Sequence, residues 1–355
     1  MELETLGWNA HWEEIAHSLL TDPNNFAARV AFAARDHLRL LGPLGELPAV
    51  LSGRARRSSP RPAAGDWVVA VPAPGAAAVV HAVLPRRSRL ARSACDRHRG
   101  EDAAATEQVL AANLDWVIVV CGLDRDYNPR RIERYVTLAW AGGAQPVVVL
   151  NKADLRSDVD VVLREVEALA PGVAALAVSA ARGEGVDGLR RVMAPGVTAC
   201  LVGSSGAGKS TLLNRLLGGE TQMTSATSES TGKGRHTTTR RELFVLPGGG
   251  VVIDTPGLRA VGLDLAEEGL DATFAEVAEL ADGCRFRDCR HQGEPGCAVA
   301  EAVAGGRLDP NRWGSYQRLS SEMRYRRLVA DGGAALAERR RWRSVSKEAR
   351  RMNRG

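Results

Sequence analysis

The chain has 355 residues, of which 45% are hydrophobic and 25% are charged, and its formal net charge is +5. This length predicts two or three domains, and the composition is that of a globular protein. No apolar run is long enough to cross a bilayer, and the acidic N-terminus has no signal-peptide pattern. These features exclude the membrane-spanning and secreted classes, and we expect a cytoplasmic protein.

Positive charge is concentrated in two blocks. Residues 45–100 carry ten arginines against three acids, and residues 339–355 carry eight basic residues against one acid. Two basic blocks separated by a neutral or acidic middle favour a polyanionic partner that binds to both blocks. A solvated tail, together with a general preference for arginine, would also explain the pattern.

The first part of the chain favours β-structure. Residues 1–28 are predicted to be a leader of weak helical character. Residues 29–93 contain short β-runs separated by glycine and proline, which predicts a small barrel. An OB-fold would suit RNA, although periodicity alone does not distinguish it from an SH3-like barrel. Residues 94–112 are predicted to form a polar linker.

The rest of the chain has a different predicted pattern of secondary structure. Residues 113–262 alternate apolar strands with helices, which predicts an α/β domain with a parallel sheet covered on both faces. Residues 263–355 contain short helices, a cysteine cluster and a basic C-terminal helix. We therefore expect three domains in series: a barrel, an α/β domain and a small α-rich domain.

The stretch GSSGAGKS follows a predicted strand and opens a helix, as a phosphate-binding loop requires. Its glycines let backbone N–H groups point at the phosphates, the helix dipole adds to the attraction, and the lysine reaches the β- and γ-phosphates. The serine after the lysine is predicted to bind Mg²⁺. The expected nucleotide contacts are Gly203, Ser204, Ser205, Gly206, Ala207, Gly208, Lys209, Ser210 and Thr211.

The stretch DTPG supplies a second nucleotide motif at the end of an apolar strand. Asp254 is expected to hold Mg²⁺ through water, and the Gly257 N–H is expected to sense the γ-phosphate. Leu258 follows, where Ras-type GTPases carry a glutamine that orients water. Leucine cannot orient water, so another residue must do so if the protein hydrolyses its nucleotide.

The polar segment 225–243 resembles a mobile switch loop. One hydroxyl among Thr237, Thr238 and Thr239 is expected to bind Mg²⁺, with Thr238 and Thr239 as the preferred candidates. His236 is the only histidine in the α/β region, and we predict that it positions or activates water. A surface histidine without a catalytic role is the alternative on these residues alone.

The stretch NKAD predicts the choice of base. Asp154 can accept hydrogen bonds from the ring N–H and the exocyclic amine of guanine, whereas adenine presents a mismatched edge. Asn151 is expected to secure the other edge, and the Lys152 stem to lie along the ring. A helix cap after a strand would be the alternative. A Ser-Ala pair follows a later strand, however, at the place where a backbone N–H that contacts guanine is expected. The predicted base-site residues are Asn151, Lys152, Ala153, Asp154, Ser179 and Ala180.

The base motif precedes the phosphate motif in this chain, the reverse of the ordinary GTPase order. Such a circular permutation is tolerated when the original termini lie close together. It makes the DTPG strand lead directly into the C-terminal region. We hypothesise that the state of the γ-phosphate is passed to the domain that follows.

Three cysteines and a histidine lie within fourteen residues: Cys284, Cys289, His291 and Cys297. Three thiolates and an imidazole complete a tetrahedral zinc site, which leaves no open position for catalysis and predicts a structural role. Disulfides are disfavoured in a reducing compartment, and free buried cysteines are the other alternative.

This combination resembles the ribosome small-subunit-dependent GTPase A (RsgA) family over residues 29–352. The resemblance is carried by GDWV, LPRRSRLAR, ANLDWVIVV, GRHTTT, the permuted motif order and the spacing of the cysteine cluster. It implies an OB-fold barrel, a circularly permuted P-loop GTPase domain and a zinc domain. It also implies one structural Zn²⁺, Mg²⁺ with GTP, a catalytic role for His236, and late maturation of the 30S ribosomal subunit with contacts to 16S rRNA. Subunit binding would stimulate hydrolysis by a monomer.

Two other classes compete with this interpretation. An RNA-binding scaffold that uses GTP only as a structural ligand is compatible with Leu258. A P-loop ATPase or kinase conflicts with Asp154, which favours guanine.

Overall fold

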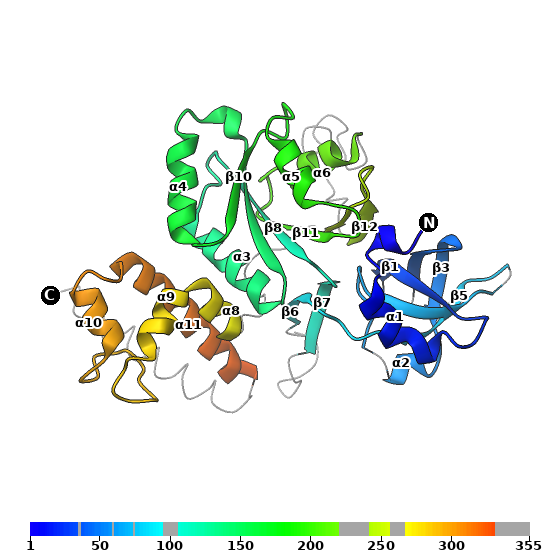
Figure 1. The fold of residues 1–355 in the computed structure, drawn as a ribbon, viewed down its shortest axis with the longest axis horizontal. Helices are drawn as coiled ribbons and strands as arrows, with labels where there is room; N and C mark the ends of the chain where they lie inside the picture. Colours follow the sequence, from blue (N-terminus) through cyan, green and yellow to red (C-terminus); the bar gives the residue numbers. More distant parts are fainter. Residues whose placement is uncertain are drawn as a thin grey trace, which may run out of the picture. The chain divides into compact units, whose positions relative to one another are not determined.

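The computed structural model describes residues 1–34, 37–58, 60–73, 75–94, 106–219, 241–255 and 267–330. The chain divides into two compact units, one of Met1–Ala91 with Val109–Leu263 and the other of Arg92–Gln108 with Asp264–Gly355 (Figure 1). The first unit contains both the barrel and the α/β sheet. Within the described residues, no helix combines the length and apolar character needed to cross a membrane.

The segment ahead of the barrel is folded and packs against it. It contains η1 (Glu4–Leu6), α1 (Ala10–Ala16) and η2 (His17–Leu19). The Asn9 side chain accepts a hydrogen bond from the backbone of His11 and caps α1. Trp8 and Trp12 are buried, and their rings lie 4.9 and 6.2 Å from that of Trp67 in the barrel. The predicted leader therefore contributes aromatic core to the first unit.

Five strands form the barrel: β1 (Phe26–Ala34), β2 (His37–Gly42), β3 (Gly45–Leu51), β4 (Trp67–Val71) and β5 (Ala78–Val83), with α2 (Ala55–Ser58) after β3. Their order is β1-β2-β3-β5-β4, and pairing of β1 with β4 closes the barrel. Only β3 and β5 run parallel. This closed five-stranded barrel confirms the predicted fold class and has the strand order of an OB-fold. Alternating residues such as Val30, Leu40, Val68 and Val80 fill its core.

The α/β part has six strands: β8 (Trp116–Gly122), β9 (Gln145–Asn151), β10 (Ala174–Val178), β11 (Thr198–Val202), β12 (Glu242–Val245) and β13 (Val251–Asp254). Their order is β10-β9-β8-β11-β13-β12, with the first five parallel and β12 antiparallel. The strand that leads into the phosphate loop, β11, lies between β8 and β13 although it follows β10 in the chain. This is the permuted order that the sequence predicts.

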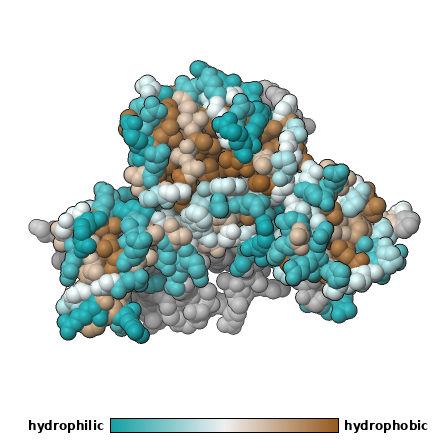
Figure 2. Space-filling model, viewed as in Figure 1, coloured by the Kyte–Doolittle hydropathy of each residue, from teal (hydrophilic) through white to brown (hydrophobic). Residues whose placement is uncertain are grey.

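Helices cover both faces of this sheet (Figure 1). Apolar residues of α5 (Val186–Val192) and α6 (Lys209–Leu217) join the core on one face. On the other face lie α3 (Pro129–Ala141), which buries Ile132, Tyr135 and Val136, and α4 (Val159–Leu169). Figure 2 shows both apolar and hydrophilic residues on the viewed face of the α/β part, with many of the apolar residues toward its middle. Short 3-10 helix η3 (Ala153–Leu155) follows β9.

The barrel and the α/β sheet are joined through hydrogen bonds. Strand β1 pairs with β12 at Phe32 and Glu242, which makes one continuous eleven-stranded sheet. Arg39 of β2 forms an ion pair with Glu242. The buried Arg29 guanidinium donates to backbone carbonyls of both parts and to the Thr198 hydroxyl at 2.7 Å. Burial lowers the pKa of Arg29 to about 10, so it remains charged at neutral pH.

Strands also occur where the sequence predicts a linker. Strands β6 (Arg89–Ala94) and β7 (Thr106–Ala112) form a separate two-stranded sheet. Leu110, Ala111 and Ala112 are fully buried at the end of β7. The composition of this region is polar, but its last residues belong to the packed part of the chain.

The second unit contains α8 (Glu267–Thr273), α9 (Ala275–Ala281), α10 (Ala298–Ala304) and α11 (Pro310–Ala330). Phe274 is fully buried at the centre of its core, which includes Leu270, Val277, Val299 and Met323. The guanidinium of Arg312 lies 4.2 Å from the centre of the Phe274 ring. The cysteine cluster lies in the irregular segment between α9 and α10, where regular secondary structure contributes little to the core.

Candidate guanine-nucleotide site and metal cluster

The phosphate-binding loop connects β11 to α6. Gly203, Gly206 and Gly208 have φ values of 145°, 85° and 92°, which side chains rarely allow. A Cβ atom at Gly203 or at Gly208 would lie 2.2 Å from a neighbouring oxygen or nitrogen. Because the first N–H groups of α6 have no acceptor within the helix, they are available to an anion. The half-buried Ser210 and Thr211 stand in this first turn, and Ser205 is exposed beside it.

Lys209 is held against the loop that it follows. Its ammonium donates to the carbonyl oxygens of Gly203 at 2.8 Å and Ser204 at 2.6 Å. An ammonium has three donors, so the third can meet a phosphate oxygen. Burial lowers the pKa of Lys209, while the charges of Asp254 and Asp126 act in the opposite direction.

Asp254 ends β13 beside the phosphate loop, in register with Leu201 of β11. It is only 4% exposed, and burial raises its pKa although the charge of Lys209 acts against the rise. A cation bound near this carboxylate would favour its ionised form. Gly257, Leu258, His236, Thr238 and Thr239 lie outside the described residues.

Asn151 ties two nucleotide loops together. Its Nδ2 donates to the Ala207 carbonyl at 2.9 Å, and its Oδ1 accepts from the Ala180 N–H at 3.0 Å. The sequence predicts that Asn151 and the Ala180 N–H contact guanine, but here they bond to protein groups. One Nδ2 hydrogen remains for a base edge, and a guanine oxygen would share the Ala180 N–H with Asn151.

Asp154 and Ser179 come together as the base-site prediction requires. A hydrogen bond from the Ser179 side chain holds the pKa of Asp154 below its ordinary value. The Arg182 guanidinium lies 3.7 Å from the Asp154 carboxylate. The carboxylate is therefore ionised at neutral pH and able to accept two hydrogen bonds from a base. Ala153 lies between Lys152 and Asp154 in the short helix η3.

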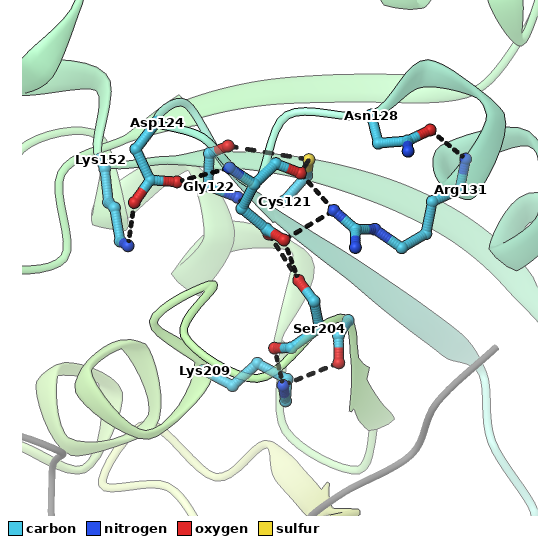
Figure 3. A network of polar contacts seen from close by, with 10 residues as sticks. Cys121, Gly122, Asp124, Asn128, Arg131, Lys152, Ser204 and Lys209 are labelled. Carbon is cyan, nitrogen blue, oxygen red and sulfur yellow. Dashed lines mark hydrogen bonds and ion pairs between the residues drawn. The ribbon is translucent and has the colours of Figure 1, made fainter.

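Two aspartates outside the predicted site residues support these motifs, and Figure 3 shows one of them, Asp124, beside Lys152. Lys152 has a left-handed backbone, and its ammonium bonds to Asp124 at 2.6 Å. Asp126 accepts from the Ser204 hydroxyl at 2.6 Å and pairs with Arg131 of α3. Both aspartates follow the carboxyl end of the parallel strand β8. That position at the edge where ligands bind was the available sequence signal.

The four predicted metal ligands also come together. One ligand atom from each of Cys284, Cys289, His291 and Cys297 lies within 4.8 Å of all the others. The His291 Nδ1 is 3.5 Å from the Cys284 sulfur and 3.4 Å from the Cys297 sulfur. All three cysteines are free of disulfides. This arrangement could hold a metal ion.

The surroundings of the cluster fit a metal. The backbone N–H of Ala300 donates to the Cys297 sulfur at 3.4 Å at the start of α10, and such donors stabilise a thiolate. The His291 ring lies edge-on to Trp313, with ring centres 6.0 Å apart. A soft set of three sulfurs and one nitrogen suits zinc or another thiophilic metal rather than magnesium or calcium.

Comparisons with known proteins give a consistent result. A family model described as RsgA GTPase matches residues 83–264. The small ribosomal subunit biogenesis GTPase RsgA of Syntrophotalea carbinolica is 44% identical, over 100% of this chain and 98% of that protein. The protein of the same name from Opitutus terrae is 46% identical, over 97% of this chain and 96% of that protein. The crystal structure of YjeQ from Thermotoga maritima aligns with a TM-score of 0.63 at 26% identity, covering 84% of this chain and 98% of that one.

Proposed function

Because this chain belongs to the RsgA GTPase family, we propose that it binds the 30S ribosomal subunit, assists late maturation of that subunit and hydrolyses GTP in response to it. The observation that carries this proposal is the convergence of the base motif, the phosphate motif and Asp254 at one edge of the sheet. The full-length similarity to proteins named for small ribosomal subunit biogenesis supports the biological role. We further propose that the protein acts as a monomer in the cytoplasm.

We propose a division of labour within the nucleotide site. Asp154 reads guanine, aided by Asn151 and the Ser179–Ala180 loop. The loop from Gly203 to Thr211 binds the phosphates. Mg²⁺ would be held by the Ser210 hydroxyl, by Asp254 through water, and by Thr238 or Thr239, and when bound it would neutralise charge on the β- and γ-phosphates. Lys209, already held by two loop carbonyls, presents its remaining donor to the same phosphates.

The metal of the second unit is proposed to be one structural Zn²⁺. Three cysteine sulfurs and one imidazole would fill a tetrahedral coordination sphere, so no position is left for substrate. Zinc would clamp the irregular segment between α9 and α10 to the helical core.

The proposed polyanionic partner is 16S rRNA. On the barrel, Arg54, Arg56, Arg57 and Arg61 are all exposed in and around α2. Arginines of this kind bind phosphates without reading sequence, and such binding weakens as salt rises. The basic residues 339–355 lie outside the described residues and would supply a second contact.

We expect His236→Ala to lower subunit-stimulated GTP turnover by about 100-fold, because a general base or water-orienting residue contributes at least that much. Steady-state phosphate release in the presence of purified 30S subunits measures the effect. Co-sedimentation of the variant with 30S subunits and a non-hydrolysable GTP analogue should be unchanged.

His17→Ala, which removes an exposed histidine of the N-terminal helices, is the matched control and should turn over GTP as the wild type does. Full stimulated turnover by His236→Ala would show that this histidine has no catalytic role. If the wild type binds the subunit normally but shows no stimulated turnover, the result would favour the GTP-dependent RNA scaffold. That class is compatible with Leu258, which cannot orient water.

A further inference from the structure

The helix that begins at the phosphate-binding lysine also holds the loop expected to contact guanine. Arg215 lies on α6, and its Nε donates to the Ala180 carbonyl at 3.1 Å. Its Nη2 donates to the next carbonyl, that of Ala181, at 2.6 Å. A planar guanidinium can make two such bonds in a fixed geometry, which an ammonium cannot reproduce.

Further contacts fix the position of the Arg215 guanidinium. Gly183 of the same loop packs over it, since a Cβ atom there would lie 3.6 Å from the Arg215 Cζ. The Arg190 guanidinium, on the helix that follows the loop, donates to the Arg215 carbonyl at 3.0 Å. The loop between β10 and α5 is thus bound to α6 through the side chain of Arg215, and α5 is bound to the backbone of the same residue.

Two further hydrogen bonds of this loop are made to groups outside α6. The Ala180 N–H bonds to Asn151 at the end of β9, and the Gly183 N–H bonds to the Ser179 carbonyl within the loop itself. Arg215 therefore joins the loop expected to contact guanine directly to the helix whose first turn is predicted to bind phosphate. No nucleotide motif includes this position.

We propose that Arg215 is a positioning residue for the nucleotide: it holds the Ala180–Ala181 backbone in place for guanine and slows the release of GDP. This inference rests on the proposed guanine-nucleotide site. Arg215 is exposed and touches no part of the predicted nucleotide contacts through its own side chain except the Ala180 carbonyl. Arg215 acts through the loop. Loss of its two hydrogen bonds therefore frees the loop and leaves the phosphate contacts in place.

The test is the dissociation rate of a fluorescent N-methylanthraniloyl-GDP from the full chain, chased with excess unlabelled GDP. Arg215→Ala is expected to accelerate release by about tenfold, because it removes two hydrogen bonds from a charged donor at a solvent-exposed site. Arg215→Lys keeps the charge but not the planar pair of donors. Its GDP dissociation rate should lie between those of the wild type and Arg215→Ala. Arg191→Ala removes another exposed arginine, from α5, and should release GDP as the wild type does.

A purely structural role for Arg215 would lower thermal stability without producing this order of GDP release rates. We therefore expect the melting temperature of the nucleotide-free Arg215→Ala protein to stay within about 2 °C of wild type, consistent with an exposed substitution. Unchanged GDP release from folded Arg215→Ala, or release from Arg215→Lys as slow as from the wild type, would overturn the inference. Should Arg215→Ala not fold, the lysine variant alone decides. Failure of the wild type to bind guanine nucleotide would instead refute the proposed function.

Discussion

Replacement of Asp154 by Asn is expected to weaken GTP and GDP binding by about two orders of magnitude and to create binding of xanthine nucleotides. The carboxylate accepts from the ring N–H and from the exocyclic amine of guanine. An asparagine amide has one acceptor and one donor group, so its NH₂ would face the amine of guanine. Xanthine carries a carbonyl in place of that amine and would accept the hydrogen bond.

Calorimetric titration of both proteins with GDP and with XDP measures this exchange of specificity. Ser179 helps to keep Asp154 ionised, so the wild-type preference should persist across neutral pH. Asp158→Asn is the matched control, because Asp158 is also an aspartate held by an arginine just beyond β9 but is not in the motif. Equal GDP affinity of the Asp154→Asn and wild-type proteins would show that this carboxylate does not read the base.

Loss of the metal is expected to unfold the segment between α9 and α10 and to destabilise the second unit. Metal binding in small zinc domains is worth on the order of 10 kcal/mol, comparable with the whole stability of a domain. Cys297→Ser removes a buried ligand whose sulfur also accepts the N–H of Ala300 at the start of α10. We expect metal content to fall from one zinc per chain to near zero and the segment to become sensitive to limited proteolysis.

Elemental analysis and protease digestion of the purified protein provide the readouts, and GDP affinity should change little because the nucleotide motifs belong to the other unit. Cys121→Ala, which changes a buried cysteine of β8 outside the cluster, should keep its metal. Full metal content with unchanged protease resistance in Cys297→Ser would contradict a four-ligand structural site. A different metal would correct the assignment of zinc.

The fold class was predictable because its signals are local. Near-continuous apolar strands alternate with helices in the α/β part, and the structure confirms a permuted P-loop sheet together with a closed barrel. The packing of the N-terminal helices was not predictable, because Trp8 and Trp12 are fixed by Trp67, which is distant in sequence.

Part of the candidate site was likewise predictable from local motifs, and part of it depends on tertiary contacts. The loop from Gly203 to Ser210 and the NKAD stretch are contiguous motifs, so their residues could be selected from sequence alone. Asp124, Asp126 and Arg215 belong to no such motif, and only tertiary contacts connect them with the nucleotide loops. The roles of the selected residues in GTP binding and of His236 in hydrolysis remain predictions that the experiments above address.

The most direct measurement of the central claim is GTP turnover by the purified chain alone, with 30S subunits and with 50S subunits as a control. The proposed function predicts slow turnover alone and a large stimulation by 30S subunits only, since water must be positioned without a glutamine after DTPG. An unchanged rate with 30S subunits to which the protein demonstrably binds would contradict a subunit-stimulated GTPase and would favour the RNA-binding scaffold.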